Sequence, residues 1–327
     1  MRFNQAEKYE IIRMVENSAF GVKRTLKELG INKSTFYNWY SAFLEMGYEG
    51  LTSQQRRMNQ VWNRIPQQEK NRIVEIALDK PELSPRELAY YITDTEKRFI
   101  SESSVYRILK EKGLITSPAY VLIRASDSFK DKTTGINQMW QTDFTYFKII
   151  GWGWYYLSSI LDDFSRYIIA WDLCSSMTAQ DVQQTVDNAL IHAGLHGEHK
   201  PRLLSDNGSC YLSKELKKYL LGKGIRQING KPNHPQTQGK IERYHRSMKN
   251  VINLDHYVCP DELQRKLAEF IDYYNNHRYH EALNNVTPAD VYFGRAVKIL
   301  RERQKIKIQT LKERKSEYQK IKVTLCH

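Results

Sequence analysis

The chain has 327 residues, a hydrophobic content of 41% and a formal net charge of +13. This length favours two or three domains, and the hydrophobic content is sufficient for buried cores. Because there is no apolar run of about 18 residues and no apolar signal sequence at the N-terminus, we expect a cytoplasmic protein without a transmembrane helix.

Residues 1–50 are predicted to form a helix-turn-helix DNA-binding domain. The segment RTLKELGINKSTFYNWY contains an apolar helix, a turn at Gly30 and a second, more polar helix. In proteins of this form the second helix enters the major groove of DNA. Three-helix packing without DNA binding is the alternative. The candidate DNA contacts on the second helix are Lys33, Ser34, Thr35 and Asn38.

Residues 51–66 are predicted to be a linker, and residues 67–115 a second helix-turn-helix domain. In the linker, Arg56 and Arg57 are candidate phosphate contacts. In the second domain, SPRELAYY begins with a capping-box pattern and has proline at the first helical position. The segment ISESSVYRILKEKGL is a further candidate recognition helix. Its candidate DNA contacts are Ser103, Ser104 and Arg107.

After a predicted linker over residues 116–135, the pattern of residues 136–295 indicates an α/β domain. Three strand patterns come first, and helices and strands then alternate. The predicted strands are Gln138–Ile149, Trp154–Leu161, Tyr167–Leu173, Pro201–Ser205 and Arg226–Asn229. The predicted helices are Thr178–Ala193, Ser213–Gly222 and a helix over about 238–253.

Three acidic residues in this domain are candidates for metal-dependent chemistry. Asp143 lies in the strand pattern WQTDFTY, Asp206 lies in the turn LLSDNG, and Glu242 lies in the helix of HPQTQGKIERYHRSMK. Mg²⁺ prefers oxygen ligands, and a pair of such ions can hold the attacking and leaving oxygens of a phosphodiester. Taken singly, Asp206 could equally start a turn, and Glu242 could form a surface pair with Arg246.

These motifs together resemble the catalytic core of bacterial insertion-sequence transposases, which are related to retroviral integrases. That family's pattern is Asp, then Asp, then 35 residues, then Glu, with Lys or Arg seven residues later. Here 35 residues separate Asp206 from Glu242, and Lys249 lies seven residues after Glu242. The segments DFSRYIIAW and YYNNHRYHEALNNVTPA also match the family, so that the resemblance covers roughly residues 135–295.

The resemblance implies an RNase H-like fold, with a five-stranded mixed sheet flanked by helices and the three acids at one edge. It also implies that Asp143, Asp206 and Glu242 bind two Mg²⁺ or Mn²⁺ ions per active site. Further candidate contacts to DNA phosphates near them are Lys249, Lys240, Arg243 and His234. The helix-turn-helix segments resemble those that precede the core in such transposases.

Positive charge is concentrated in two regions. Residues 202–249 contain 11 Lys or Arg against 3 Asp or Glu, and residues 295–322 have the same counts. Basic surfaces bind phosphate backbones through counterion release. Residues 296–327 are therefore predicted to be a basic helical tail that either orders on nucleic acid or stays solvated.

The predicted function is that of a DNA transposase that cuts element ends and joins them to target DNA. Its partners would be double-stranded DNA and further copies of the chain, as a dimer or higher oligomer, with neither a membrane nor a small-molecule cofactor. A nuclease of the same fold without strand transfer is one alternative. A catalytically idle DNA-binding regulator is the other. The four cysteines form no CxxC pair and indicate no zinc site or disulfide framework.

Overall fold

The protein is described here from a computed structural model that covers residues 3, 5–18, 20–52, 61–115, 133–195, 197, 200–230 and 238–324. The chain divides into two compact units, residues 1–64 and residues 65–327. The finer division predicted from the sequence, with separate core and tail, stays a prediction.

The first unit is a small helical domain. Its elements are α1 (Gln5–Glu16), α2 (Val22–Glu28), α3 (Lys33–Met46) and the 3-10 helix η1 (Gly47–Leu51). Ile12, Leu26, Phe36 and Leu51 are buried together at its centre. Gly30 has a φ of 66° between α2 and α3, a left-handed conformation that favours glycine. The predicted helix, turn and helix are therefore confirmed.

The second unit begins with another helical module. It contains α4 (Gln67–Asp79), α5 (Pro85–Thr95) and α6 (Glu102–Glu111), packed around residues such as Leu88 and Val105. Ser84 and Glu87 form the predicted capping box at the start of α5, with Pro85 at the first helical position. We refer to residues 65–115 as the second module.

A five-stranded mixed sheet follows, in the order β3-β2-β1-β4-β5. β1, β2 and β3 pair antiparallel, whereas β4 lies parallel to β1, and β5 lies parallel to β4. This arrangement confirms the predicted α/β class and all five predicted strands, to within one residue at each end. The strands are β1 (Met139–Ile149), β2 (Gly153–Asp162), β3 (Ile168–Cys174), β4 (Arg202–Ser205) and β5 (Arg226–Asn229).

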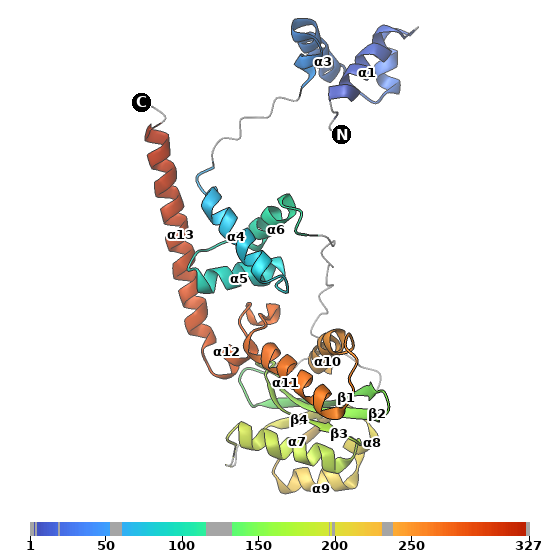
Figure 1. Cartoon of the computed structure of the whole chain (residues 1–327), viewed down its shortest axis with the longest axis vertical. Coiled ribbons are helices and arrows are strands. Elements are labelled where there is room, and N and C mark those ends of the chain that lie inside the picture. Colours follow the sequence, from blue (N-terminus) through green and yellow to red (C-terminus); the bar gives the residue numbers. More distant parts are fainter. Residues whose placement is uncertain are drawn as a thin grey trace. The chain divides into compact units, whose positions relative to one another are not determined.

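Helices cover both faces of the sheet (Figure 1). On one face α7 (Ala179–His192), α8 (Ser209–Leu212) and α9 (Lys214–Gly222) bury residues such as Val182 against the strands. On the other face α10 (Gly239–Ile252) and α11 (Pro260–Asn276) bury Ile241 and Met248. Fully buried apolar side chains on each face supply the main stabilisation of these layers.

The C-terminal part continues from the sheet into a long helix. After the short helices η3 (Glu281–Leu283) and α12 (Pro288–Tyr292), α13 extends from Ala296 to Thr324. Tyr292 stacks on Tyr167, with ring centroids 4.6 Å apart, and is buried against the core. Among the described residues, no helix is both long enough and apolar enough to cross a membrane.

Candidate active site

Asp143 and Asp206 lie on neighbouring parallel strands. In the β1–β4 pairing, Gln141 is opposite Leu204. Asp143 comes two residues after Gln141 and is still within β1. Asp206 comes two residues after Leu204, directly after the end of β4. Because neighbouring strands are about 4.8 Å apart, this register brings the two acids to equivalent positions at one edge of the sheet.

The start of α10 is fixed to β1 by two hydrogen bonds from residues that come just before Glu242. The Gln238 side-chain amide donates to the carbonyl of Thr142, at 3.3 Å. The backbone N–H of Ile241 donates to the side-chain carbonyl of Gln141, at 3.1 Å. Since both acceptors belong to residues just before Asp143, these bonds bring the first turn of α10, including Glu242, to the same edge.

His245 provides a third link between α10 and Asp143. Its Nδ1 lies 3.4 Å from Oδ2 of Asp143, and the ring is buried, with 6% of the residue exposed. The other carboxylate oxygen, Oδ1, accepts a hydrogen bond from the N–H of Phe144, at 2.9 Å. The buried Nε2 of His245 has no hydrogen-bond partner among the described residues. Asp143 is therefore held from two sides.

The pKa values of the other two acids are consistent with a shared electrostatic environment. Burial, and then the negative charge of Asp143, raise the pKa of Glu242 above its ordinary value. Burial also raises the pKa of Asp206, and the charge of Asp143 raises it further. Like charges that lie close together disfavour ionisation. The charge of Asp143 therefore acts on both of its predicted partners.

The donor set of the three acids suits a divalent cation. Within the part of the chain that is described, no group of three or more His, Cys, Asp or Glu side chains is arranged to hold a metal ion. Three carboxylates from three elements, two of them with raised pKa values, are nevertheless the hard oxygen ligands that Mg²⁺ prefers. A bound cation would relieve the repulsion that Asp143 causes.

Asp206 also fulfils the role of a turn residue. Its Oδ1 accepts a hydrogen bond from the N–H of Gly208, at 2.8 Å, in an Asx-type turn. The side chain of Asn229 donates to its backbone carbonyl, at 3.2 Å. The turn and the candidate catalytic role are compatible, because the second carboxylate oxygen is not used by this bond.

Two of the predicted phosphate contacts lie on α10 close to these acids. Lys249 places its ammonium group 4.3 Å from the centre of the Tyr146 ring, and Tyr146 is an exposed residue of β1 three positions after Asp143. Arg243 is exposed, and its Nε donates to the carbonyl of Gly239, at 2.8 Å. Their contact with DNA stays a prediction.

Lys240 has a partner within the protein, and its contact with DNA stays a prediction. Its ammonium group lies 2.6 Å from Oδ2 of Asp163, a carboxylate with 2% of its residue exposed. Oδ1 of Asp163 accepts a hydrogen bond from Gln141, at 2.7 Å, and Thr133 donates to Oδ2, at 2.6 Å. A buried carboxylate requires such partners, so Lys240 neutralises Asp163. It fastens α10 to the end of β2.

Gln141 and Asp163 support the candidate site, although neither is predicted as a site residue from the sequence. Gln141 is almost fully buried, and joins Asp163 to the first turn of α10 through its two amide atoms. The neighbouring Asp162 accepts hydrogen bonds from Asn137 and Ser165, and burial raises its pKa. The signal in the sequence is the acidic pair of Asp162 and Asp163 at the end of a strand pattern, where Asp163 is the first residue of the segment DFSRYIIAW.

Comparisons with known proteins identify the family of the chain. Two family models described as "Integrase core domain" match residues 134–235 and 223–288. Two models described as "Homeodomain-like domain" match residues 4–52 and 35–109. An uncharacterized transposase-like protein of Haemophilus influenzae is 30% identical over 155 residues, which cover 47% of this chain and 70% of that protein. The chain belongs to the transposases that carry an integrase core domain.

Other relatives are similar over shorter and longer parts of the chain. The transposase for insertion sequence element IS904 of Lactococcus lactis is 29% identical over 163 residues, 49% of this chain. The transposase for transposon Tn552 of Staphylococcus aureus is 24% identical over 312 residues, 85% of this chain. The chain spans 62% of the length of each of these two relatives.

Among solved structures, the HTLV-2 integrase catalytic core domain in complex with magnesium is 21% identical and gives a TM-score of 0.40. The match covers 49% of this chain and 98% of that structure.

The predicted DNA contacts on the two helical modules differ in their surroundings. On α3, Lys33, Ser34 and Asn38 are exposed, whereas Thr35 is half-buried. On α6, Ser103 and Arg107 are exposed and Ser104 is half-buried. Arg107 donates to the carbonyl of Ser103, at 3.1 Å. Three further predicted contacts lie outside the described residues: Arg56, Arg57 and His234.

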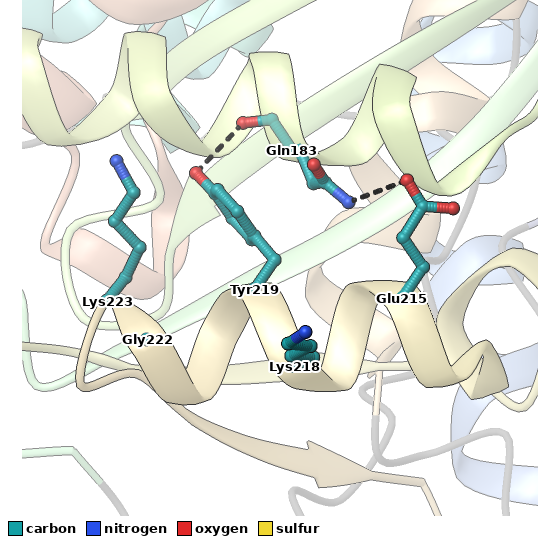
Figure 2. A pocket seen from close by; sticks show the side chains of 6 residues that line it. All are labelled: Gln183, Glu215, Lys218, Tyr219, Gly222 and Lys223. Carbon is teal, nitrogen blue, oxygen red and sulfur yellow. Dashed lines mark hydrogen bonds between the residues drawn. The ribbon is translucent and has the colours of Figure 1, made fainter.

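A pocket of about 400 Å³ lies elsewhere, between α7 and α9 (Figure 2). Tyr219 donates to the carbonyl of Gln183, at 3.3 Å, and Glu215 accepts from the Gln183 amide, at 3.5 Å. Neither Asp143, Asp206 nor Glu242 lines this pocket. This pocket is therefore separate from the three candidate acids.

Proposed function

We propose that the chain is a DNA transposase that binds the ends of its mobile element, hydrolyses a phosphodiester there and transfers the new 3′ end to target DNA. The observation that carries this proposal is the meeting of Asp143, Asp206 and the first turn of α10 at one edge of the sheet. Membership in the integrase-core transposases supports it. We expect it to act on double-stranded DNA in the bacterial cytoplasm.

Asp143, Asp206 and Glu242 would be the ligands of the catalytic ions. Two Mg²⁺ or Mn²⁺ ions, when bound, supply the activation of water or of a 3′-hydroxyl and the neutralisation of charge on the phosphodiester. The three carboxylates hold the site at the sheet edge, and the contact between His245 and Asp143 orients one of them. No Ser, Tyr or Cys nucleophile is required, because the attacking group is water or DNA itself.

Lys249 and Arg243 would hold phosphates next to the carboxylates. Both lie on α10, where Lys249 comes seven residues and Arg243 one residue after Glu242. Fixed positive groups close to a phosphodiester stabilise the charge that develops in its transition state. The exposed polar residues of α3 and α6 would bind duplex DNA, with the second helix of each module in the major groove. Joining two element ends to one target would require at least a dimer.

Replacement of Asp206 by asparagine tests this proposal. Asp206→Asn keeps the shape of the side chain and loses the charge, so we expect Mg²⁺-dependent cutting of end-containing DNA to fall by at least about a thousandfold. Binding of the same DNA should stay within about twofold in a gel-shift assay, because the helical modules are unchanged. Asp261→Asn, an exposed acid on α11, is the matched control and should cut normally.

The products distinguish transposition from the alternatives. Labelled element-end DNA and a supercoiled target, incubated with and without Mg²⁺, should give both a nicked end and a joined product. Nicking without joining would indicate a nuclease, and binding without either product would indicate a regulator. Full cutting by Asp206→Asn would refute the catalytic assignment.

A further inference from the structure

The C-terminal helix α13 starts from a part of the chain that is fixed to the catalytic core. The Tyr292 hydroxyl donates to the side chain of Asn137, at 3.2 Å, just before β1. Arg295 pairs with Asp290 of α12, at 2.9 Å. The side chain of Asn275 in α11 makes two hydrogen bonds to the backbone of Ile168 in β3. The base of α13 is therefore held by the sheet that carries Asp143.

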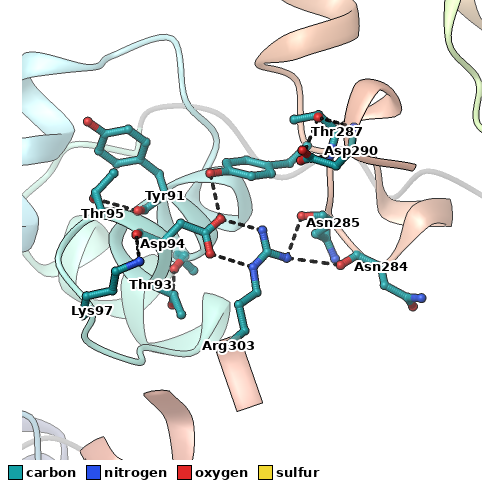
Figure 3. A network of polar contacts seen from close by, with 12 residues as sticks. Tyr91, Thr93, Asp94, Thr95, Lys97, Asn284, Asn285, Thr287, Asp290 and Arg303 are labelled. Carbon is teal, nitrogen blue, oxygen red and sulfur yellow. Dashed lines mark hydrogen bonds and ion pairs between the residues drawn. The ribbon is translucent and has the colours of Figure 1, made fainter. Parts of the chain in front are cut away.

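Arg303, two turns into α13, enters a network with the second module (Figure 3). Its Nε and Nη2 donate to the two carboxylate oxygens of Asp94 in α5, at 2.8 and 2.6 Å. Its Nη1 donates to the carbonyl of Asn285, at 2.8 Å. The guanidinium group lies 4.8 Å from the centre of the Tyr90 ring, and also over the ring of Tyr279. One buried cation thus joins α13, α5 and the loop before α12.

A second buried arginine repeats this contact further along the same face of α13. Arg314 donates to Glu69 of α4, at 2.6 Å, and to the carbonyl of Phe99, at 3.1 Å. Between the two arginines, Thr310 accepts a hydrogen bond from the N–H of Phe99, at 3.1 Å. Arg303 and Arg314 are eleven residues apart, or about 16 Å along the helix axis. Two points this far apart restrict rotation of the module.

The loop of the core that precedes α12 makes separate contacts with the second module. Arg86 of α5 pairs with Glu281, at 2.7 Å. The Tyr279 hydroxyl donates to Asp94, at 3.2 Å, and the ring of Tyr279 lies 6.2 Å from that of Tyr90. The second module is thus attached both to α13 and to the core itself. The basic tail predicted from the sequence to be solvated or to await nucleic acid uses its buried arginines for this internal contact.

These contacts leave the candidate recognition helix of the module available. The docking residues of the module lie on α4, on α5 and in the loop before α6, whereas Ser103 and Arg107 of α6 are exposed. The core of the module joins α5 to α6 through Leu88, Ile92, Val105 and Ile108. A constraint on α5 is therefore a constraint on α6.

We propose that α13, through Arg303 and Arg314, is a strut that sets the distance and rotation of the DNA-reading helix α6 relative to the catalytic carboxylates. This inference rests on the proposed function, because it assumes that α6 binds duplex DNA and that the core cuts it. Arg303 is then a positioning residue that acts through α5 and touches neither DNA nor the reacting atoms. It would select which phosphodiester reaches Asp143, at a fixed number of base pairs from the segment that α6 contacts.

The test uses the full chain and DNA in which this number of base pairs is changed. The DNA is a labelled duplex copied from the sequence that flanks the gene of this chain, with the footprint of the second module mapped first. Insertions of one to five base pairs are placed between the footprint and the cut site. Five base pairs turn the cut site to the opposite side of the duplex, since a helical turn takes about 10 base pairs. The wild-type chain should cut the DNA with this insertion at least about tenfold more slowly than the DNA with the native spacing.

Three variants are compared with the wild type. Arg303→Met and Asp94→Asn each remove the ion pair between α13 and α5, the first from α13 and the second from α5. Both variants should cut DNA of the native spacing about tenfold more slowly than the wild type does. Their cutting rates should no longer depend on spacing, so that the rates for all the DNA substrates agree within about twofold. Arg301→Met removes the same charge from an exposed residue about 200° around α13, and should keep the wild-type dependence. A general loss of stability would lower all rates without making them equal.

Amide hydrogen exchange on the same proteins measures the docking directly. In Arg303→Met and Asp94→Asn, we expect faster exchange in α5 and in the middle of α13, with unchanged protection in β1 and α10. Unchanged protection in β1 and α10 indicates a folded core, and if Arg303→Met fails this check, the smaller change Asp94→Asn decides. Wild-type spacing dependence together with wild-type protection of α5 in these variants would overturn the inference. If the wild-type chain cuts no DNA at all, the proposed function fails. The hydrogen exchange of α5 and α13 then tests by itself whether Arg303 holds the second module against α13.

Discussion

At the scale of single residues, Asp143 has the strongest influence on the site. Its charge raises the pKa of both Asp206 and Glu242, after the effect of burial, while His245 lies against one of its own oxygens. Without a cation, such an arrangement of acids costs free energy, because burial and the charge of Asp143 disfavour the ionised forms of Asp206 and Glu242. The same repulsion would favour the binding of Mg²⁺.

The stability of the metal-free protein should therefore respond to Glu242→Gln. A carboxyl group whose folded pKa is raised favours the folded state fully below its ordinary pKa, and this effect is lost as the pH rises through the raised value. At pH 7 the charged Glu242 thus destabilises the fold. We expect Glu242→Gln to raise the melting temperature by about 1–3 °C at pH 7, and to have no effect near pH 3, below the ordinary glutamate pKa of about 4.3.

Calorimetry with and without millimolar Mg²⁺ checks this expectation. Mg²⁺ should raise the melting temperature of the wild type, and raise that of Glu242→Gln much less, because a ligand of the ion is missing. A variant that melts below the wild type at pH 7, or that gains equally from Mg²⁺, would contradict the electrostatic account.

At the scale of elements, the placement of α10 decides whether Glu242 reaches the sheet edge. Gln141 holds the first turn of this helix by accepting from the N–H of Ile241, and donates to the buried Asp163. Lys240 adds an ion pair to the same carboxylate. The apolar residues Ile241 and Met248 then fix the face of α10 that meets the strands. Polar contacts therefore set the position of the first turn of α10, and burial of its apolar side chains stabilises the packing of the helix on the sheet.

Gln141→Leu should separate these two contributions. The leucine keeps the apolar packing, but leaves Asp163 and the N–H of Ile241 each without one buried partner, at a cost of about 1–3 kcal/mol. Urea denaturation should show this loss. Cutting of end-containing DNA should fall by at least about tenfold, whereas DNA binding should not change. Gln184→Leu on the exposed side of α7 is the control, and wild-type cutting by Gln141→Leu would show that α10 is held without this bond.

At the scale of the whole molecule, positive charge and helical modules serve the same predicted partner. The formal net charge of +13 favours non-specific attraction to duplex DNA, and the first unit has a compact core of its own. Its helix α3 exposes Lys33, Ser34 and Asn38. Contacts to phosphates fix position on DNA, and contacts to base edges select sequence.

The salt dependence of binding distinguishes these contacts. A plot of the logarithm of the association constant of the full chain against the logarithm of salt concentration should fall steeply. Lys33→Ala should reduce its slope by about one if Lys33 contacts a phosphate. Lys266→Ala, which removes an exposed lysine paired with Glu269 on α11, should leave the slope unchanged. Equal slopes for Lys33→Ala and the wild type would remove Lys33 from the DNA interface.

The sequence by itself determined the order and type of the elements, because periodicity, caps and turns are local signals. The strand patterns, the capping boxes at Ser84 and Thr178, and the helix that carries Glu242 were all predictable in this way. The resemblance of the motif spacing to the family pattern also indicated the three candidate acids, whose role stays a prediction.

The tertiary structure alone decided which charged groups serve the fold. Lys240 meets Asp163 across 77 positions of the chain, Gln141 meets Ile241 across 100, and Arg303 meets Asp94 across 209. No local pattern encodes such a pairing, because a basic residue on a helix has the same spacing whether it faces solvent, phosphate or a buried carboxylate. Its partner is chosen only when packing removes both groups from water, where an unpaired charge is too costly to keep.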